Sequence, residues 1–137
     1  MIKELSALWL GAGVGATARW QLGIWLNPGQ AHQLPWGTWV ANACGAYLIG
    51  LGVTVLQHHP HIDPAWRLLL ITGFLGALTT FSTFSMETVS LLAMHKWGLA
   101  LGNVGANVLG SLLLTYLGWL SGEWWLSQTG WASPPSH

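Results

Sequence analysis

Charged residues are scarce in this sequence. Its 137 residues include only four Lys or Arg and four Asp or Glu, about a quarter of the share that is usual in a soluble domain. No charge occurs in residues 68–86 or 97–122, and Arg19 is the single charge in residues 5–62. A helix needs about 20 apolar residues to cross the ~30 Å hydrocarbon core of a bilayer. We therefore predict an all-α integral membrane protein with one domain over residues 1–126.

Other absences exclude whole classes of function. The net charge is zero and no basic patch occurs, so nothing favours a nucleic-acid partner. Cys44 is the single cysteine, which excludes an intramolecular disulfide, and we interpret it as a small packing residue. Paired carboxylates are missing, as is a nucleophile beside a base, so we expect no enzymatic activity.

Tryptophan, in contrast, is abundant, with eleven copies. Indole rings favour the interface between lipid and water, and eight of the eleven lie near the ends of apolar segments: Trp25, Trp36, Trp39, Trp66, Trp97, Trp119, Trp124 and Trp125. The segments predict four transmembrane helices at about 5–26, 36–57, 65–95 and 99–120, with a disordered tail over 127–137. Residues 5–14 could instead form the apolar part of a signal peptide. Because Glu4 cancels Lys3 in front of it, we favour a retained first helix.

Small residues recur four positions apart in the first and fourth segments. Such pairs let helix backbones approach closely in a membrane, and they are Gly11/Gly15, Ala12/Ala16, Gly98/Gly102, Ala106/Gly110 and Gly118/Gly122. Residues 11–16 also match a dinucleotide-binding pattern, but the acid that this pattern requires about 20 residues later is absent. Close helix packing is therefore the better interpretation.

The most unusual stretch is residues 73–87, GFLGALTTFSTFSME, in the third segment. Five of the seven residues from Thr79 to Ser85 carry a hydroxyl, although the segment is otherwise apolar. A straight helix of ~30 residues would be ~45 Å long, more than the hydrocarbon core requires. Gly73 and Gly76 precede the hydroxyl run, so we predict a break between Gly76 and Thr80. Carbonyls freed at a break can bind a cation, and freed N–H groups favour an anion.

Polar residues on the neighbouring segments complete a possible anion path. Thr38 and Asn42 share one face of the second helix, and the fourth carries a polar stripe at four-residue spacing: Asn103, Asn107, Ser111 and Thr115. Amide and hydroxyl donors, together with the weakly positive ring edges of Phe81 and Phe84, suit a small dehydrated anion. The histidines at 58, 59 and 61 bracket a proline, and we interpret them as a solvated loop rather than a metal site.

The distribution of charge leaves the orientation of the chain in the membrane undecided. With four spans, Lys3 and Arg67 lie on one side, while Lys96 and the end of the helix that carries Arg19 lie on the other. Two positive charges on each side give the positive-inside rule no preference. We therefore predict that the chain inserts in both orientations and that two opposite copies pair.

Three motifs resemble the Fluc (CrcB) family of fluoride channels. The third segment carries Gly76-x-x-Thr79-Thr80-Phe81-Ser82-Thr83-Phe84-Ser85-x-Glu87, which looks like the signature of the family. The second-helix motif of the family is similar to Gly37-Thr38-x-x-x-Asn42-x-x-Gly45, and the first-helix motif is similar to Gly15-Ala16-x-x-Arg19. The polar residues from Asn103 to Ser111 stand where the family has its fourth-helix polar residues. The resemblance covers all four segments in order.

The resemblance implies an antiparallel, dual-topology homodimer in the cell inner membrane, surrounded by lipid and with two pores. Each pore would export fluoride passively and selectively, which keeps cytoplasmic fluoride low. It implies a vestibule arginine at Arg19 and a structural sodium ion at the dimer centre, bound by the main-chain carbonyls of Gly76 and Thr79. The fluoride path that it implies comprises Asn42, Phe81, Ser82, Thr83, Phe84, Ser85, Asn107 and Ser111.

Two alternative functions need weighing against a fluoride channel. A small dual-topology multidrug exporter would need a central membrane carboxylate, typically in the first helix, where this chain has only Arg19. A non-transporting membrane assembly subunit would explain the glycine pairs and the asparagines. It would not explain five hydroxyls beside a helix break.

Overall fold

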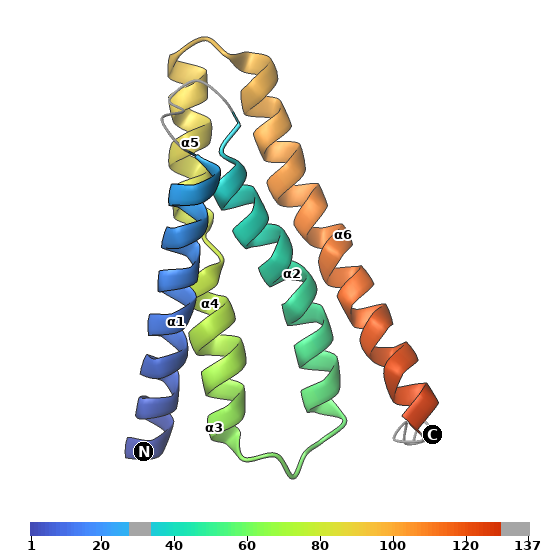
Figure 1. Ribbon diagram of the computed structural model, residues 1–137. Helices are drawn as coiled ribbons and strands as arrows, with labels where there is room; N and C mark the ends of the chain where they lie inside the picture. The colour runs from blue at the N-terminus through green and yellow to red at the C-terminus, as the bar shows by residue number, and fades with distance from the viewer. Residues whose placement is uncertain (28–33, 130–137) are drawn as a thin grey trace.

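The computed structural model describes residues 1–27 and 34–129, and its regular secondary structure in these ranges is helical (Figure 1). The elements in chain order are α1 (Ile2–Leu26), α2 (Trp36–Gln57), α3 (Pro64–Arg67), η1 (Leu68–Leu75), α4 (Gly76–Leu78), α5 (Phe81–Ala93) and α6 (Trp97–Thr129). The elements from α3 to α5 follow one another along the predicted third segment, and η1 is a π-helix. The prediction of an all-α protein is confirmed.

Three helical stretches are long and apolar enough to cross a membrane: Trp36–Gln57, Pro64–Ala93 and Trp97–Thr129. They correspond to the second, third and fourth predicted spans, and the second agrees with its predicted bounds. At 25 residues α1 is long enough, but it is not among the three. Arg19, Gln21 and several glycines lower its hydropathy. The prediction of a multi-pass membrane protein is thus confirmed, with three of its four spans.

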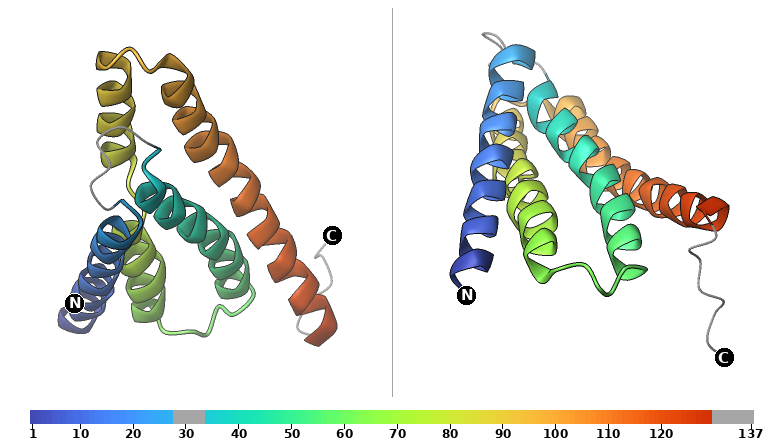
Figure 2. Two further views of the ribbon diagram at one scale, coloured as in Figure 1. Left: turned by 45° about the horizontal axis from the view of Figure 1, so that its top comes forward. Right: turned by 60° about the horizontal axis from the view of Figure 1, so that its bottom comes forward.

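The helices form two closely packed pairs that diverge from each other (Figures 1 and 2). α1 packs mainly along η1 and α4, and α2 packs mainly along α6, while α5 packs against the first half of α6. A buried cluster of Ala41, Leu75 and Leu78 joins the two pairs. It places the end of α4 directly against the middle of α2, where Asn42 lies.

Glycines make both close pairings possible. A Cβ added at Gly11 or Gly15 of α1 would overlap the carbonyl oxygen of Leu69 or Phe74, respectively. In the same way, the carbonyl of Tyr47 occupies the space where Gly118 of α6 lacks a side chain. The predicted pairs Gly11/Gly15 and Gly118/Gly122 therefore pack against neighbouring helices. The Gly98/Gly102 pair does not, because a Cβ at either position would meet nothing within 4 Å in the described chain.

The third span is broken where the sequence predicts a break. Helix α4 ends at Leu78, Thr79 is extended with φ −78° and ψ 154°, and Thr80 is extended with φ −153° and ψ 113°. A new helix begins at Phe81, and the Thr80 hydroxyl caps it by accepting a hydrogen bond from the Thr83 N–H at 3.2 Å. Because threonine is a favourable N-cap residue, the local sequence itself restarts the helix after the break.

The turn between α5 and α6 is closed by main-chain hydrogen bonds. His95 has φ 57°, and the N–H groups of His95 and Lys96 donate to the carbonyls of Leu92 and Leu91, both at 2.9 Å. This is the Schellman arrangement that commonly ends a helix. The following helix, α6, continues to Thr129, so the predicted end near residue 120 is wrong, and residues 127–129 are helical rather than part of a tail. The remainder of the predicted tail, residues 130–137, lies outside the described residues.

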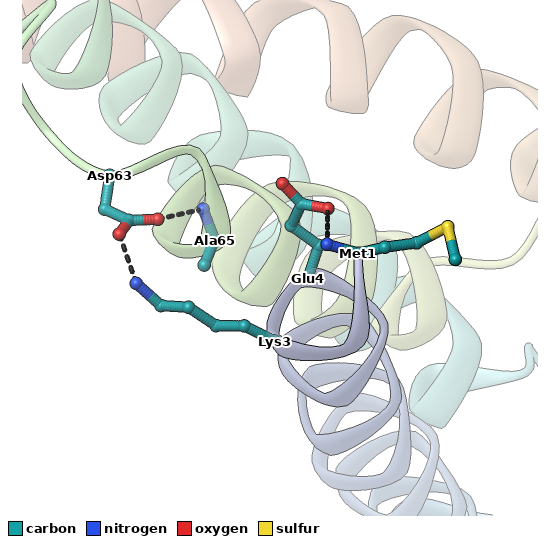
Figure 3. A network of polar contacts seen from close by, with 5 residues as sticks. All are labelled: Met1, Lys3, Glu4, Asp63 and Ala65. Atoms are coloured by element: carbon teal, nitrogen blue, oxygen red, sulfur yellow. Dashed lines mark hydrogen bonds and ion pairs between the residues drawn. The ribbon is translucent and has the colours of Figure 1, made fainter.

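An exposed network ties the start of α1 to the connection between α2 and α3 (Figure 3). The Lys3 ammonium pairs with the Asp63 carboxylate, and the other oxygen of Asp63 accepts a hydrogen bond from the Ala65 N–H at 2.9 Å. The hydrogen bond from Lys3 lowers the pKa of Asp63 below its ordinary value, and the Ala65 N–H adds to this effect. Lys3 and the α2–α3 connection therefore lie at the same end of the helices.

Candidate functional site

Asn42 replaces the helical hydrogen bonds that are lost at the break. Its side-chain oxygen accepts from the Thr80 N–H at 2.7 Å, and its Nδ2 donates to the Thr80 carbonyl at 3.2 Å. The second Nδ2 hydrogen goes to the side-chain oxygen of Asn107 on α6 at 2.8 Å. An unpaired backbone group inside a membrane costs several kcal/mol. The asparagine on α2 is therefore what makes extended backbone tolerable at Thr80.

At the break, two N–H groups donate to side chains instead of to the main chain. Two main-chain carbonyls are therefore left without their helical donors. In a continuous helix the Gly76 carbonyl would accept from the Thr80 N–H, which instead donates to Asn42. The Thr79 carbonyl would accept from the Thr83 N–H, which instead donates to the Thr80 hydroxyl. Gly76 is exposed and Thr79 is half-buried. These are the two residues predicted to bind a cation, and free carbonyl oxygens are suitable ligands for one.

No acidic or histidine cluster competes for that role in residues 1–27 and 34–129. No group of three or more His, Cys, Asp or Glu side chains there could hold a metal ion. The rings of His58 and His59 instead lie against main-chain carbonyls of their own helix, Thr54 at 3.0 Å and Val55 at 2.7 Å. A cation near the break would therefore depend on main-chain oxygens.

The two phenylalanines after the break make contact but differ in exposure. Their ring centroids are 5.4 Å apart, and the rings meet edge to face at 63°. Phe84 is 6% exposed, whereas Phe81 is 77% exposed. Phe84 is thus fixed in the subunit, and Phe81 projects from it. Exposed apolar side chains are common on this chain, so what distinguishes Phe81 is its edge-to-face contact with a buried ring.

A groove of about 430 Å³ connects the break with α6. It is lined by Asn42, Gly45, Ala46, Ile49, Thr79, Thr80, Phe81, Phe84, Asn107, Val108, Ser111, Leu112 and Thr115. The groove thus brings together five of the predicted anion-path residues: Asn42, Phe81, Phe84, Asn107 and Ser111. Ser111 and Thr115 make no hydrogen bond within the described chain, so their hydroxyls are free to donate into the groove. Chemically, the groove offers hydrogen-bond donors and ring edges on an apolar wall.

Three of the predicted path residues do not line this groove. The Thr83 hydroxyl accepts a hydrogen bond from the Thr80 hydroxyl at 2.9 Å. The Ser82 hydroxyl lies 3.3 Å from the Thr80 hydroxyl. The Ser85 hydroxyl donates to the Phe81 carbonyl at 2.8 Å, within its own helix. In the described chain these hydroxyls therefore form a patch at the start of α5, beside the exposed Phe81.

Arg19 stands apart from the groove. It is partly exposed on α1 and makes no hydrogen bond or ion pair with the described residues. Its charge is therefore not neutralised by a neighbouring carboxylate of the subunit. An uncompensated arginine near a helix end raises the local concentration of anions.

A larger groove of about 710 Å³ lies elsewhere between α2 and α6 and contains none of the predicted site residues. Its lining is mostly apolar and aromatic: Tyr47, Leu51, Val55, Leu117, Leu120, Ser121, Trp124 and Trp125. A hydrogen bond of 3.1 Å joins its two hydroxyls, Tyr47 and Ser121. The smaller groove is the better functional candidate, because its polar groups converge on a break in the backbone.

Sequence reasoning did not find two polar pairs beside the site. The Thr38 hydroxyl donates to Glu87 Oε1 at 2.6 Å, while Glu87 Oε2 is buried and has no partner in the described chain. The Asn103 amide donates to the Thr88 hydroxyl at 2.9 Å. Each of these four residues is visible in the sequence, but only the packing of α5 between α2 and α6 brings them together.

Comparison with known proteins identifies the family. A family model described as CrcB-like protein, Camphor Resistance (CrcB), matches residues 6–119. The chain belongs to the CrcB family. The match includes the break, the groove and Arg19. It ends at residue 119, whereas α6 continues to Thr129.

Curated relatives in this family resemble the chain over most of its length. A protein of Albidiferax ferrireducens named fluoride-specific ion channel FluC is 55% identical over 118 residues, which are 86% of this chain and 88% of the relative. Proteins of the same name from Paracidovorax citrulli and Pseudomonas aeruginosa are each 48% identical over 128 residues, 93% of this chain and 100% of the relative. The similarity therefore covers most of this chain and most of each relative.

Proposed function

We propose that the chain forms a fluoride-selective channel that releases fluoride passively from the cytoplasm. The observation that carries the proposal is the convergence of an amide, free hydroxyls and a phenylalanine pair on one groove at a helix break. Its relatives, at up to 55% identity, are named fluoride-specific ion channels. The chain is accordingly a transport protein and not an enzyme.

Fluoride passes along the groove by exchanging water for protein donors. The hydroxyls of Ser111 and Thr115 donate hydrogen bonds, and the ring edges of Phe81 and Phe84 supply weakly positive contacts. The amides of Asn42 and Asn107 form a polar wall of the path, because their N–H groups already donate within the chain. The hydroxyls of Ser82, Thr83 and Ser85 continue the path around the start of α5. Arg19 raises the concentration of anions at the entrance. None of the groups along the groove carries a charge, so the ion can leave as readily as it enters.

The functional unit is a homodimer of two oppositely oriented copies with two pores, located in the inner membrane. In this unit α1 spans the membrane as the fourth helix, since its glycines hold it along η1. Phe81 is 77% exposed in one subunit and the groove beside it is open, so a second copy is needed to close the path. With two positive charges on each side, the chain has no preferred orientation.

A sodium ion fits the carbonyls at the break. The Gly76 and Thr79 carbonyls would hold it, because both have lost their helical donors to side chains. Such an ion would supply a positive charge at the break. The chain itself contributes the extended Thr79–Thr80 backbone, which Asn42 and the Thr80 hydroxyl keep open.

The alternative functions have less support. A multidrug exporter needs an accessible membrane carboxylate, and Glu87 is already engaged by the Thr38 hydroxyl at 2.6 Å. A non-transporting assembly subunit has no use for the free donors of Ser111 and Thr115.

Fluoride and chloride efflux from liposomes that contain the purified protein tests the proposal. Fluoride efflux without chloride efflux is expected, and absence of both would reject a channel. The change Phe81→Ala should slow fluoride efflux about tenfold, which corresponds to ~1.4 kcal/mol of lost ring contact. Leu101→Ala is the matched control, because Leu101 is 73% exposed and does not line the groove. Equal rates for the two variants would contradict the site assignment.

A further inference from the structure

A directed chain of hydrogen bonds leaves the backbone of α5 and returns to it one turn later. It begins at the Thr80 N–H, which donates to Asn42 Oδ1 at 2.7 Å, and continues from Asn42 Nδ2 to Asn107 Oδ1 at 2.8 Å. Asn107 Nδ2 then donates to Asn103 Oδ1 at 2.9 Å. We call the side chains of Asn42, Asn107, Asn103 and Thr88 the amide relay.

The relay ends as it begins, on a backbone group that cannot reverse. Asn103 Nδ2 donates to the Thr88 hydroxyl at 2.9 Å, and that hydroxyl donates to the Phe84 carbonyl at 2.8 Å. The first backbone group is a donor and the last is an acceptor. Main-chain groups also fix the amides between the two ends: Asn42 binds both the N–H and the carbonyl of Thr80, and Asn107 Nδ2 donates to the Asn103 main-chain carbonyl at 3.1 Å. Each side-chain amide then matches its neighbours along the relay.

Burial makes this direction costly to change. Asn103 is 1% exposed and Asn107 is 6% exposed, so neither can exchange its partner for bulk water. Reversing one amide would oppose two N–H groups or two oxygens, and a buried polar group without a partner is expensive. The relay therefore holds one arrangement of donors, in which the two Asn42 Nδ2 hydrogens go to the Thr80 carbonyl and to Asn107 Oδ1.

We propose that Asn103 and Thr88 are positioning residues for the anion path: they hold α5, and with it the ring edges of Phe81 and Phe84, in register against Asn42 and α6. Neither residue lines the groove. Without this link α5 can shift relative to α6, and the two rings then move away from the groove. The effect on transport rests on the proposed function as an anion channel. The hydrogen bonds of the relay do not, because they are present in the chain itself.

The relay also fixes α5 itself. Both of its ends lie on the first turns of that helix, at Thr80 and Phe84, while its middle lies on α2 and α6. The phenylalanine pair therefore keeps its register against the groove for the same reason that Asn42 keeps its direction.

The test compares Thr88→Val with Thr88→Ser in the full-length protein. Valine has the shape of threonine but cannot accept from Asn103, and serine restores the acceptor. We expect Thr88→Val to slow fluoride efflux about fivefold, the effect of losing the one hydrogen bond from Asn103 to Thr88. Thr88→Ser should stay near the wild-type rate. Asn103→Leu, which removes two links, should slow efflux further.

Thr54→Val is the matched control. The Thr54 hydroxyl donates to the carbonyl four residues earlier, Gly50, at 2.8 Å, as the Thr88 hydroxyl does to Phe84, but it accepts from no amide. A role in helix packing alone would make the two valine variants equivalent. Equal efflux from Thr54→Val and Thr88→Val would therefore overturn the proposal.

A second measurement reports the relay directly. The side-chain amide resonance of Asn42 in selectively ¹⁵N-labelled protein should move in Thr88→Val and remain in place in Thr54→Val, although Thr88 does not contact Asn42. An unmoved resonance would overturn the relay even if efflux changed. If the wild-type protein carried no fluoride, the proposed function would fail, and this resonance would still decide whether the relay exists.

Discussion

The contact between α1 and η1 and the contact among α2, α5 and α6 are made of different chemistry. Along α1 the backbone of η1 lies in the space left by Gly11 and Gly15, and no side-chain hydrogen bond joins described residues of α1 to residues 64–93. Around α5, in contrast, Asn42, Asn103 and Glu87 each accept or donate hydrogen bonds between helices. The first contact depends on shape alone, and the second on matched polar groups.

This difference separates what supports the fold from what serves transport. Close backbone packing is sufficient to associate helices in lipid. Polar groups buried in a membrane are costly and are usually retained for a function. Substitutions in the two regions should therefore fail in different ways: loss of folding along α1, and loss of flux with the fold retained around α5.

The largest effect should come from Gly15→Val. A Cβ at Gly15 would overlap the Phe74 carbonyl oxygen, so α1 must move away from η1, at a cost of about 3 kcal/mol. Gly13→Val is the control, because a Cβ there meets nothing within 4 Å. Size-exclusion chromatography and thermal unfolding in detergent measure the difference. Equal stability of the two variants would show that α1 does not depend on this contact.

A smaller effect is expected from Gly45→Ala, where a glycine of α2 packs closely against the polar break. The added methyl group would collide with Cγ2 of Thr79, which stands at the break. We expect the free energy of unfolding to fall by about 2 kcal/mol and fluoride efflux to slow. The double variant Gly45→Ala/Thr79→Ser removes the colliding methyl group and should recover both properties. Failure to recover would place the cause outside this contact.

The next effect concerns the polar region alone. Thr38→Val removes the hydroxyl that donates to Glu87 Oε1 and leaves both carboxyl oxygens without a donor, at about 1–2 kcal/mol. Thr17→Val on α1 is the control, because the Thr17 hydroxyl is exposed and donates to the Gly13 carbonyl of its own helix. Thermal unfolding should separate the two, and a larger loss for Thr17→Val would reverse the comparison.

The smallest effect should come from Asp63→Asn, in the exposed network at the start of α1. Asparagine keeps the hydrogen bond to the Ala65 N–H and loses only the ion pair with Lys3. Because Lys3 lowers the pKa of Asp63, the pair stabilises the protein above the ordinary carboxyl pKa, and this contribution disappears as the pH falls through the lowered value. High salt should also remove it.

The measurement is the difference in Tm between wild type and Asp63→Asn as a function of pH. The difference should be small at neutral pH and should vanish in acid. If it grew in acid, the ionised carboxylate would not be the stabilising form.

Much of the fold followed from local patterns. Runs without charge located three spans, and the second helix began and ended at its predicted residues, since a proline precedes Trp36 and histidines follow Gln57. The break was predictable because glycines precede a run of hydroxyl residues within one long segment. The end of α6 was not, because the prediction ended the helix near residue 120, about the length of a membrane span, and the helix continues to Thr129.

The site was less predictable than the fold. The sequence predicted one anion path for Asn42, Phe81, Phe84, Asn107 and Ser111, from polar spacing along single helices and from the resemblance to the CrcB family, and all five line one groove. The partners of these residues could not be assigned. Whether Asn103 reaches Thr88 or solvent depends on the rotation of α5 relative to α6, and no residue pattern encodes that rotation.

The length of α6 has a consequence of its own. Its 33 residues extend ~50 Å, well beyond a hydrocarbon core of ~30 Å, and the helix slants away from the others (Figure 2). A helix too long for its bilayer adjusts by tilting. The slant of α6, which forms one wall of the groove, therefore depends on bilayer thickness, so lipids of different chain length would act on this protein as a mechanical variable.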